Sequence, residues 1–188
     1  MVSNGWITSF VLMVVCLASC FKKNTPEVRL PEVIKQNGLT KIRLLPPRKG
    51  NPRNSEGDFL QLNDGRIMFI YSHYYAGEGH DNDPAYLVAR FSSDGGLSWT
   101  PHDVKVLENE GMMNVMSVSL LRLASEEIAL FYLRKNSVED DRPILRLSTD
   151  EAQSWSDPIE IIGDEEIGYY VVNNDRVIQL QNGRLIVP

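Results

Sequence analysis

The apolar residues of this chain fall in short runs rather than in long amphipathic stretches. Segments such as 86–91 and 144–147 are rich in Val, Ile, Leu, Phe and Tyr, and Gly, Asn and Asp interrupt the sequence between such runs. Runs of about four to eight β-branched and aromatic residues between turn formers are typical of β-strands. The pattern therefore predicts an all-β protein.

Turn sequences return along the chain at a nearly fixed interval. A Ser-x-Asp segment that ends in Trp occupies residues 92–99 and returns at residues 148–155. A hairpin-type turn between apolar runs recurs at 62–67, 123–128 and 180–185, with a similar spacing. Asn-Asp-Gly and Gln-Asn-Gly favour tight hairpins because these residues accept positive φ. Each repeat then holds four antiparallel strands, the composition of a β-propeller blade.

The number of repeats bears on how such a propeller could close. The predicted blades span residues 42–100, 101–157 and an incomplete 158–188. Propellers close with about four to eight blades, and two and a half cannot close. We therefore expect this sequence to be the N-terminal part of a longer propeller, or else a truncated product that does not fold alone. A two-sheet sandwich is disfavoured because it would not require the same turn at a fixed interval.

The N-terminal segment has the pattern of an export signal. Residues 1–19 carry no charged side chain, and 10–18 are all apolar. Such a run is too short to span a bilayer but suits the core of a signal peptide. It ends in Leu-Ala-Ser-Cys, which resembles a bacterial lipobox with Cys20 as the lipidated residue; a plain secretory signal is the alternative. We predict a tether over residues 20–41 and a lipid-anchored protein of the bacterial cell envelope, on a membrane, in the periplasm or at the cell surface.

Charge and cysteine content narrow the classes of partner. The 188 residues include 25 Asp and Glu against 19 Lys and Arg, a net charge of −6. No basic stripe is present, so a nucleic-acid partner is not expected. Both cysteines, Cys16 and Cys20, belong to the predicted leader and its cleavage point, so the mature domain has no disulfide or cysteine-based metal site. No cofactor is predicted.

The Ser-x-Asp-x-Gly-x-x-Trp segment at 92–99, its spacing and residues 178–188 together resemble the sialidase (neuraminidase) superfamily with its Asp-box, or BNR, repeats. The resemblance is greatest to exported bacterial members and covers residues 45–188. It implies a six-bladed propeller and an exo-sialidase-like glycoside hydrolase that releases terminal sialic acid from sialylated glycans. Sialidases use a Tyr nucleophile, which a Glu activates; both, with two further arginines, would lie beyond Pro188. A non-catalytic glycan-binding or scaffold propeller is the alternative.

The Asp-box residues themselves are interpreted as structural. Asp94 and Asp150 can accept hydrogen bonds from backbone N–H groups of their turns. In the family these turns lie on the outer hairpin, away from the substrate. The second segment departs from the pattern because Ala152 replaces a glycine that eases the turn. Arg90 and Arg146, which precede the two segments, are also interpreted as structural.

Polar residues mark the places where the innermost strand of each predicted blade begins. In a propeller the ligand usually lies on the axis beside these strand starts. Arg53 and Asn114 stand at the same distance before the first two repeated turns, and residues 173–176 precede the third. The pattern favours a polar axial site. Arg176 belongs to it or, alternatively, forms an ion pair with Asp175 or a neighbouring blade.

The resemblance assigns a role to Arg53, which occupies the place of the first of three arginines that bind the sialic acid carboxylate. A guanidinium group suits this task because its planar fork gives bidentate, charge-assisted hydrogen bonds. The usual Arg-Ile-Pro signature is replaced here by Arg53-Asn54-Ser55. Glu56 would orient Arg53 through an ion pair, and a solvated loop carboxylate is the alternative.

The family's general acid/base is an aspartate in the loop before the first Asp-box. That loop contains Asp81, the preferred candidate, and Asp83, the second choice. Burial on loop closure would raise the pKa of Asp81, as a proton donor requires. A solvated loop or a weak cation site is the alternative. A metal site is not expected, because His80, Asp81 and Asp83 are crowded on one loop with no further ligand.

Overall fold

The computed structural model describes residues 31–188. The predicted signal peptide, Cys20 and the first part of the predicted tether lie outside the described residues. Twelve β-strands in four sheets and one short 3₁₀ turn, η1 (Asp164–Glu166), make up the regular structure. The prediction of an all-β protein is confirmed. Across 31–188 no helix has the length and apolar character needed to cross a membrane.

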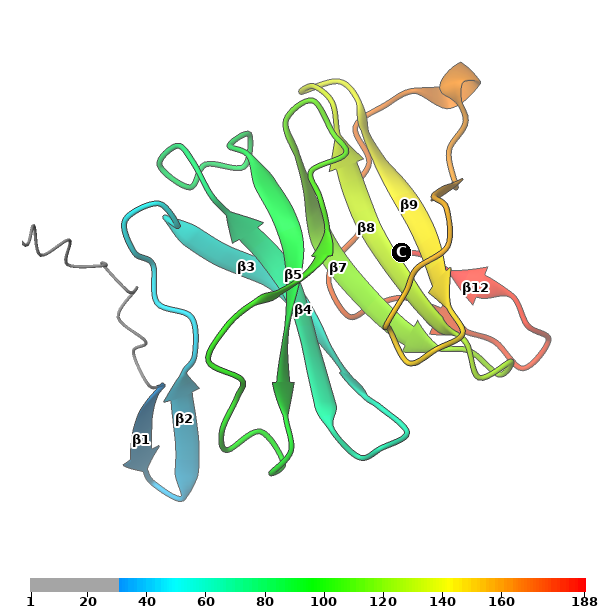
Figure 1. The fold of residues 1–188 in the computed structure, drawn as a ribbon. Coiled ribbons are helices and arrows are strands. Elements are labelled where there is room, and N and C mark those ends of the chain that lie inside the picture. Colours follow the sequence, from blue (N-terminus) through cyan, green and yellow to red (C-terminus); the bar gives the residue numbers. More distant parts are fainter. Residues whose placement is uncertain (1–30) are drawn as a thin grey trace, which may run out of the picture.

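Two four-stranded antiparallel sheets form most of the structure, and Figure 1 shows them side by side. In each sheet the strands follow one another as a meander, each paired with its neighbour in sequence. The first sheet consists of β3 (Arg53–Gln61), β4 (Ile67–Tyr74), β5 (Ala85–Ser92) and β6 (Val104–Leu107), and the second of β7 (Asn114–Arg122), β8 (Ile128–Lys135), β9 (Asp141–Ser148) and β10 (Ile159–Glu160).

The last strand of each sheet follows the Ser-x-Asp turn and pairs back onto the third strand. β6 pairs with β5, so the first sheet extends beyond the predicted blade boundary at residue 100. β10 pairs with β9, so the second sheet likewise extends beyond residue 157. The strand pairing thus places the break between the two sheets in the segment 108–113, between β6 and β7.

Two small hairpins complete the described chain. β1 (Glu32–Gln36) and β2 (Leu39–Arg43) pair through a turn at Asn37 and Gly38, so the predicted tether contains regular structure. This hairpin is largely exposed and stands apart from the sheets in Figure 1. β11 (Ile178–Gln179) and β12 (Leu185–Ile186) pair at the C-terminal end, where the third repeat was predicted.

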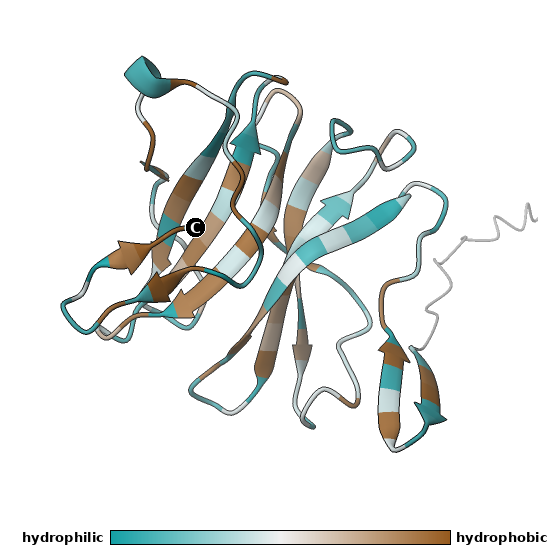
Figure 2. Ribbon diagram, turned by 180° about the vertical axis from the view of Figure 1, so that it is seen from behind, coloured by the Kyte–Doolittle hydropathy of each residue, from teal (hydrophilic) through white to brown (hydrophobic). Residues whose placement is uncertain are grey.

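Apolar side chains fill the space between successive sheets, as in the blades of a propeller. One cluster lies between the first and second sheets, and a second lies between the second sheet and residues 172–187. Figure 2 shows the brown apolar bands along the strands and the hydrophilic first half of β3. The buried members of the first cluster are Leu62, Met68, Ile70, Leu87, Ala89, Leu107, Val115, Val118, Leu120, Ile128, Leu130, Tyr132 and Ile144.

The inner strands β3 and β7 carry a bulge at the same place. Glu56 and Ser117 occupy equivalent positions of the two repeats, and both adopt positive φ, at 55° and 59°. The register shifts there in both strands. Asp175 repeats the conformation with φ 53° before β11. Bulges of this kind re-aim side chains next to functional sites. The bulges therefore repeat from one sheet to the next, in the same place as the strands of the propeller-like arrangement repeat. The sheets of residues 31–188 do not close into a ring.

Candidate functional site

The predicted site residues Arg53 and Asn114 occupy the same place in the two sheets. Arg53 begins β3 and Asn114 begins β7. Arg53 pairs across the ladder with Tyr74, which in turn pairs with Ala85. We call the end of each sheet where Arg53 or Asn114 lies its polar end, and the three paired residues there its row. The row of the first sheet is Arg53, Tyr74 and Ala85.

Arg53 is held from several sides. Its Nη2 donates to Glu56 Oε1 at 3.0 Å, its Nε donates to Ser55 Oγ at 2.8 Å, and its Nη1 donates to the Asp81 carboxylate. The guanidinium also lies 4.8 Å from the centre of the Tyr74 ring, a favourable cation–π distance. The structure therefore brings together three of the predicted site residues: Arg53, Glu56 and Asp81.

The loop that carries Asp81 is folded around Asp83. One Asp83 carboxylate oxygen, Oδ2, accepts hydrogen bonds from the backbone N–H groups of Glu78, Gly79 and His80 at 2.8–2.9 Å. Asn114 then ties this loop to the second sheet, because its Nδ2 donates to the carbonyl oxygens of Asp81 and Asp83 at 2.8 and 2.9 Å. Asp83 is a loop-forming residue here, and Asn114 connects the loop to β7.

The charges around Arg53 perturb two carboxyl groups in opposite directions. The hydrogen bond from Arg53 lowers the pKa of Asp81, whose side chain is 64% exposed. This is opposite to the raised pKa expected for a buried general acid, since the described loop leaves Asp81 in solvent and in contact with a cation. Burial raises the pKa of Glu56, and the Arg53 charge partly offsets that rise.

Three residues at this end of the second sheet were missed by the sequence analysis: Lys135, Asp141 and Tyr169. Asn114 pairs with Lys135, and Lys135 pairs with Asp141, so the row of the second sheet is Asn114, Lys135 and Asp141. The Lys135 ammonium lies 3.9 Å from Asp141 Oδ2 and donates to the Tyr169 hydroxyl at 3.4 Å. Burial raises the pKa of Asp141 to about 6.

A sequence signal for this row exists in the repeat itself. Lys135 follows Tyr74 at the same interval at which Asn114 follows Arg53. Asp141 follows Ala85 at the interval that separates the two Ser-x-Asp segments. Aligning the two repeats from the first strand onward would have placed both residues beside Asn114.

The remaining predicted substrate-contacting residue lies apart from this group. Arg176 is exposed before β11, and among residues 31–188 its side chain makes no hydrogen bond or ion pair. The structure therefore brings Arg176 neither to Arg53 nor into an ion pair with Asp175.

Both Ser-x-Asp segments form the same hydrogen-bonded turn. Asp94 Oδ1 accepts the N–H of Ser98 at 2.8 Å, and Asp150 Oδ1 accepts the N–H of Ser154 at 2.9 Å. Hydrogen bonds within the turns lower the pKa of each aspartate to about 2. Ala152 adopts φ 64° where Gly96 has 88°, so the second turn forms without the glycine.

Arg90 and Arg146 connect the strands that lead into these turns to the chain beyond them. Arg90 Nη1 donates to the carbonyl oxygen of Thr100, and Arg146 Nη1 donates to that of Ser156. Each hydrogen bond joins the strand before the turn to the residue that follows it. Their geometry agrees with a structural role.

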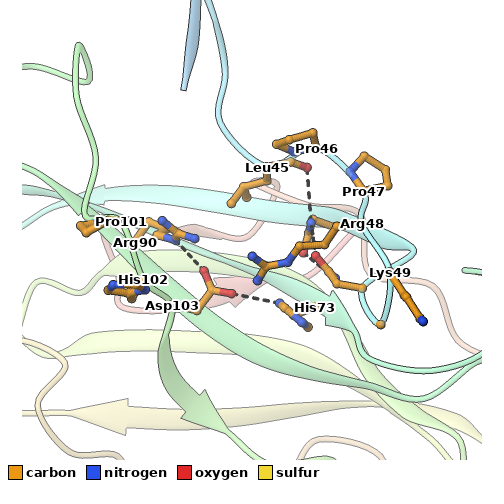
Figure 3. A pocket seen from close by; sticks show the side chains of 13 residues that line it. Leu45, Pro46, Pro47, Arg48, Lys49, His73, Arg90, Pro101, His102 and Asp103 are labelled. Atoms are coloured by element: carbon orange, nitrogen blue, oxygen red, sulfur yellow. Dashed lines mark hydrogen bonds and ion pairs between the residues drawn. The ribbon is translucent and has the colours of Figure 1, made fainter. Parts of the chain in front are cut away.

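A cavity of about 740 Å³ lies elsewhere, between the connector 45–51 and the face of the first sheet that points away from the second sheet (Figure 3). At its base Asp103 accepts hydrogen bonds from Tyr71 at 2.7 Å and Arg90 at 2.5 Å, and it lies 3.1 Å from His73. These partners outweigh burial and lower the pKa of Asp103. Neither of the two sheet rows lines this cavity. Within residues 31–188 no group of three or more His, Cys, Asp or Glu side chains is placed to hold a metal ion.

Comparisons with known proteins identify the type of fold. No protein-family model and no curated protein sequence matches the chain. Among solved structures, a protein of unknown function from Dyadobacter fermentans matches with a TM-score of 0.60 and 18% identity over 74% of this chain and 47% of its own. The Hadza microbial sialidase Hz136 matches with a TM-score of 0.57 and 14% identity over 73% and 32%.

A sialidase of Trypanosoma rangeli, solved in complex with 2,3-difluoro-KDN, also matches, with a TM-score of 0.54 and 16% identity over 82% of this chain and 27% of its own. The chain therefore spans less than half the length of each of these structures. At such identities the likeness concerns the fold, which is sialidase-like and propeller-like.

Proposed function

We propose that this chain supplies part of the catalytic propeller of a sialidase-like exo-glycoside hydrolase that releases terminal sialic acid from glycoconjugates. The observation that carries the proposal is the meeting of Arg53, Glu56 and Asp81 at the polar end of a sialidase-like fold. The fork of Arg53 already binds carboxylates through both terminal nitrogens, so a planar anion would bind there by displacing one of them.

Arg53 is proposed to bind the carboxylate of the sugar acid, and Glu56 to hold the guanidinium in place. The substrate carboxylate would take the position of Asp81 on Nη1. Asp81, once released from Arg53, loses the interaction that lowers its pKa. Burial of its carboxyl under the bound sugar would then raise that pKa, as proton donation to the glycosidic oxygen requires. Asn114 supports this step by holding the loop backbone through the carbonyl groups of Asp81 and Asp83.

The remaining parts of the family mechanism are assigned less directly. Arg176 is proposed as a further contact for the substrate; it is exposed and lies apart from the Arg53 group. A Tyr nucleophile and its Glu partner, which a retaining sialidase requires, are not assigned to any residue of 31–188.

The proposed acid/base role of Asp81 has a direct test. This chain alone is expected to be inactive, so the test uses the complete propeller of which it would form part. There Asp81→Asn should lower turnover of sialyllactose, a substrate with a poor leaving group, by about 10²–10⁴-fold. It should affect a 4-methylumbelliferyl sialoside much less, since that leaving group needs no proton. Glu78→Gln is the matched control, because Glu78 lies on the same loop with its side chain 87% exposed. Equal turnover of both substrates by the wild type and Asp81→Asn would remove Asp81 from the mechanism.

A non-catalytic glycan-binding propeller is the second candidate. The lowered pKa of Asp81 favours it, because a carboxylate that stays ionised beside Arg53 is a poor proton donor. Binding of sialyllactose without release of free sialic acid, detected by NMR over long incubation, would support this candidate against the hydrolase.

Export and anchoring are also proposed. Residues 1–19 would act as a signal peptide and Cys20 as the lipid attachment point, with residues 20–41, including the β1 strand and part of β2, as the tether. The protein would then lie in the bacterial cell envelope. Cys20→Ser should abolish incorporation of labelled fatty acid and move the protein from the membrane fraction to the soluble fraction. Equal labelling of the wild type and Cys20→Ser would contradict the lipid anchor.

A further inference from the structure

The polar row of the second sheet has hydrogen-bonding capacity that residues 31–188 leave unused. Oδ1 of Asn114 and Oδ1 of Asp141 are buried and accept no hydrogen bond from the described chain. Within that chain the Lys135 ammonium has only the 3.4 Å contact with Tyr169 and the 3.9 Å approach to Asp141. The three row residues are 0%, 2% and 1% exposed. A buried polar group without a partner destabilises the folded state, so packing alone gives no reason for this row.

The first sheet shows the same place built without such groups. Tyr74 stands where the second sheet has Lys135, and Ala85 stands where it has Asp141. Both first-sheet residues are fully buried. A sheet of this fold therefore packs well with a ring and a methyl group at these positions. The ammonium and the carboxylate of the second sheet consequently point to a ligand.

The order of groups along the row selects the chemistry of that ligand. Asn114 offers an acceptor, Lys135 a donor and Asp141 an acceptor. A hydroxyl group both donates and accepts, so neighbouring hydroxyls of a sugar can satisfy all three. An apolar substituent would leave these three polar groups without hydrogen-bond partners, and a carboxylate of the ligand would be repelled by the Asp141 carboxylate. The centre of the half-exposed Tyr169 ring lies 5.0 Å from the Lys135 ammonium.

We propose that Lys135 and Asp141 are specificity-determining residues that bind adjacent hydroxyl groups of the sugar acid whose carboxylate Arg53 holds. The binding of the carboxylate by Arg53 rests on the proposed function. The binding of hydroxyl groups by Lys135 and Asp141 requires only a sugar, so the two halves of the proposal can be tested separately.

The test uses two ligands and two kinds of variant of the full chain. N-acetylneuraminic acid carries both the carboxylate and the hydroxyls, whereas its methyl ester keeps the same ring and hydroxyls and lacks the charged carboxylate. Lys135→Tyr/Asp141→Ala gives the second sheet the last two residues of the first sheet's row and avoids an unpaired charge. Its dissociation constants, measured by NMR titration, should rise about tenfold or more for both ligands. Arg53→Met should weaken only the acid.

The outcomes separate the two halves. Wild-type affinity for both sugars in the double variant, at an unchanged melting temperature, would overturn the role of Lys135 and Asp141. A wild type that binds neither sugar would overturn it as well. If the double variant loses both ligands while Arg53→Met retains the acid, the hydroxyl subsite stands and the proposed role of Arg53 fails. Should the double variant not fold, Lys135→Met, which keeps the length of the side chain, carries the same expectation for both ligands.

Discussion

Asp58 joins the two sheets and should make the stability of the fold depend on pH. Its side chain is buried, with Oδ2 accepting the N–H of Leu120 in β7 at 2.6 Å and Oδ1 accepting the N–H of Phe59 at 2.6 Å. Leu120 belongs to the inner edge strand of the second sheet. The Asp58 carboxyl therefore accepts a hydrogen bond from the Leu120 N–H group on the unpaired edge of β7.

Burial raises the pKa of Asp58 to about 6, from a usual value of 3.8. Between these two values the folded chain binds more protons than the unfolded chain, so stability falls as pH rises. The contribution of protonated Asp58 to the free energy of unfolding is fully present below about pH 4 and is lost as pH rises through about 6. At about 1.4 kcal/mol per pH unit, the loss reaches at most about 3 kcal/mol at pH 7.

Asp58→Asn isolates this contribution. The amide keeps one acceptor and loses the other, a fixed cost of about 1–3 kcal/mol that does not change with pH. Urea unfolding of both proteins from about pH 4 to pH 7 gives the difference in free energy of unfolding. That difference should move in favour of Asp58→Asn by up to about 3 kcal/mol as pH rises. A difference that stays constant over this range, or moves in favour of the wild type, would refute the reasoning.

Three further substitutions test separate features of the fold. Gly57→Ala should lower the free energy of unfolding by about 3 kcal/mol in urea titrations, because a Cβ there would lie 2.5 Å from the Phe69 ring and 2.6 Å from the Ile70 carbonyl oxygen; a loss below about 0.5 kcal/mol would contradict this. Arg122→Ala should cost about 1 kcal/mol, because Arg122 holds Glu151 at 2.7 and 3.0 Å while Glu151 accepts the N–H of Asn63; an effect that does not shrink in high salt would count against the ion pair. Gly77→Ala should push the Asp83 carboxylate away, because Gly77 has φ 75° and a Cβ there would overlap that carboxylate. Amide hydrogen exchange at Gly79 and His80, whose N–H groups donate to Asp83, should become faster, and the global melting temperature should fall by no more than a few degrees. Unchanged exchange would show that the hydrogen bonds of Asp83 do not require a glycine at position 77.

The sequence predicts the strands and their repetition because both depend on local patterns. Turn residues at fixed spacing and apolar runs between them define β3–β5 and β7–β9, and the constant offset from each turn locates Arg53 and Asn114. The β1–β2 hairpin had a local signal that was overlooked. Asn37 and Gly38 supply the two positive φ values of a tight turn, 52° and 74°.

The other half of the site could not be predicted from local pattern. Lys135 and Asp141 stand at strand ends, where charged residues are normally solvated. Their burial comes from the pairing of three strands and from Tyr169, which reaches Lys135 from a distant part of the sequence. The exposure of Asp81 is equally non-local, because it depends on how Asp83 folds the loop and on Arg53 beneath it.

The central claim is that Arg53 binds the carboxylate of an acidic sugar, and NMR of the arginine side chains tests it most directly. The Nε–H resonance of Arg53, assigned by its loss in Arg53→Met, is followed during titration with N-acetylneuraminic acid. It should shift and saturate with the same dissociation constant as the Asp81 and Asn114 amides, because the proposal has the sugar carboxylate displace Asp81 from the guanidinium. An Arg53 resonance that does not move while the ligand saturates other residues would contradict the claim.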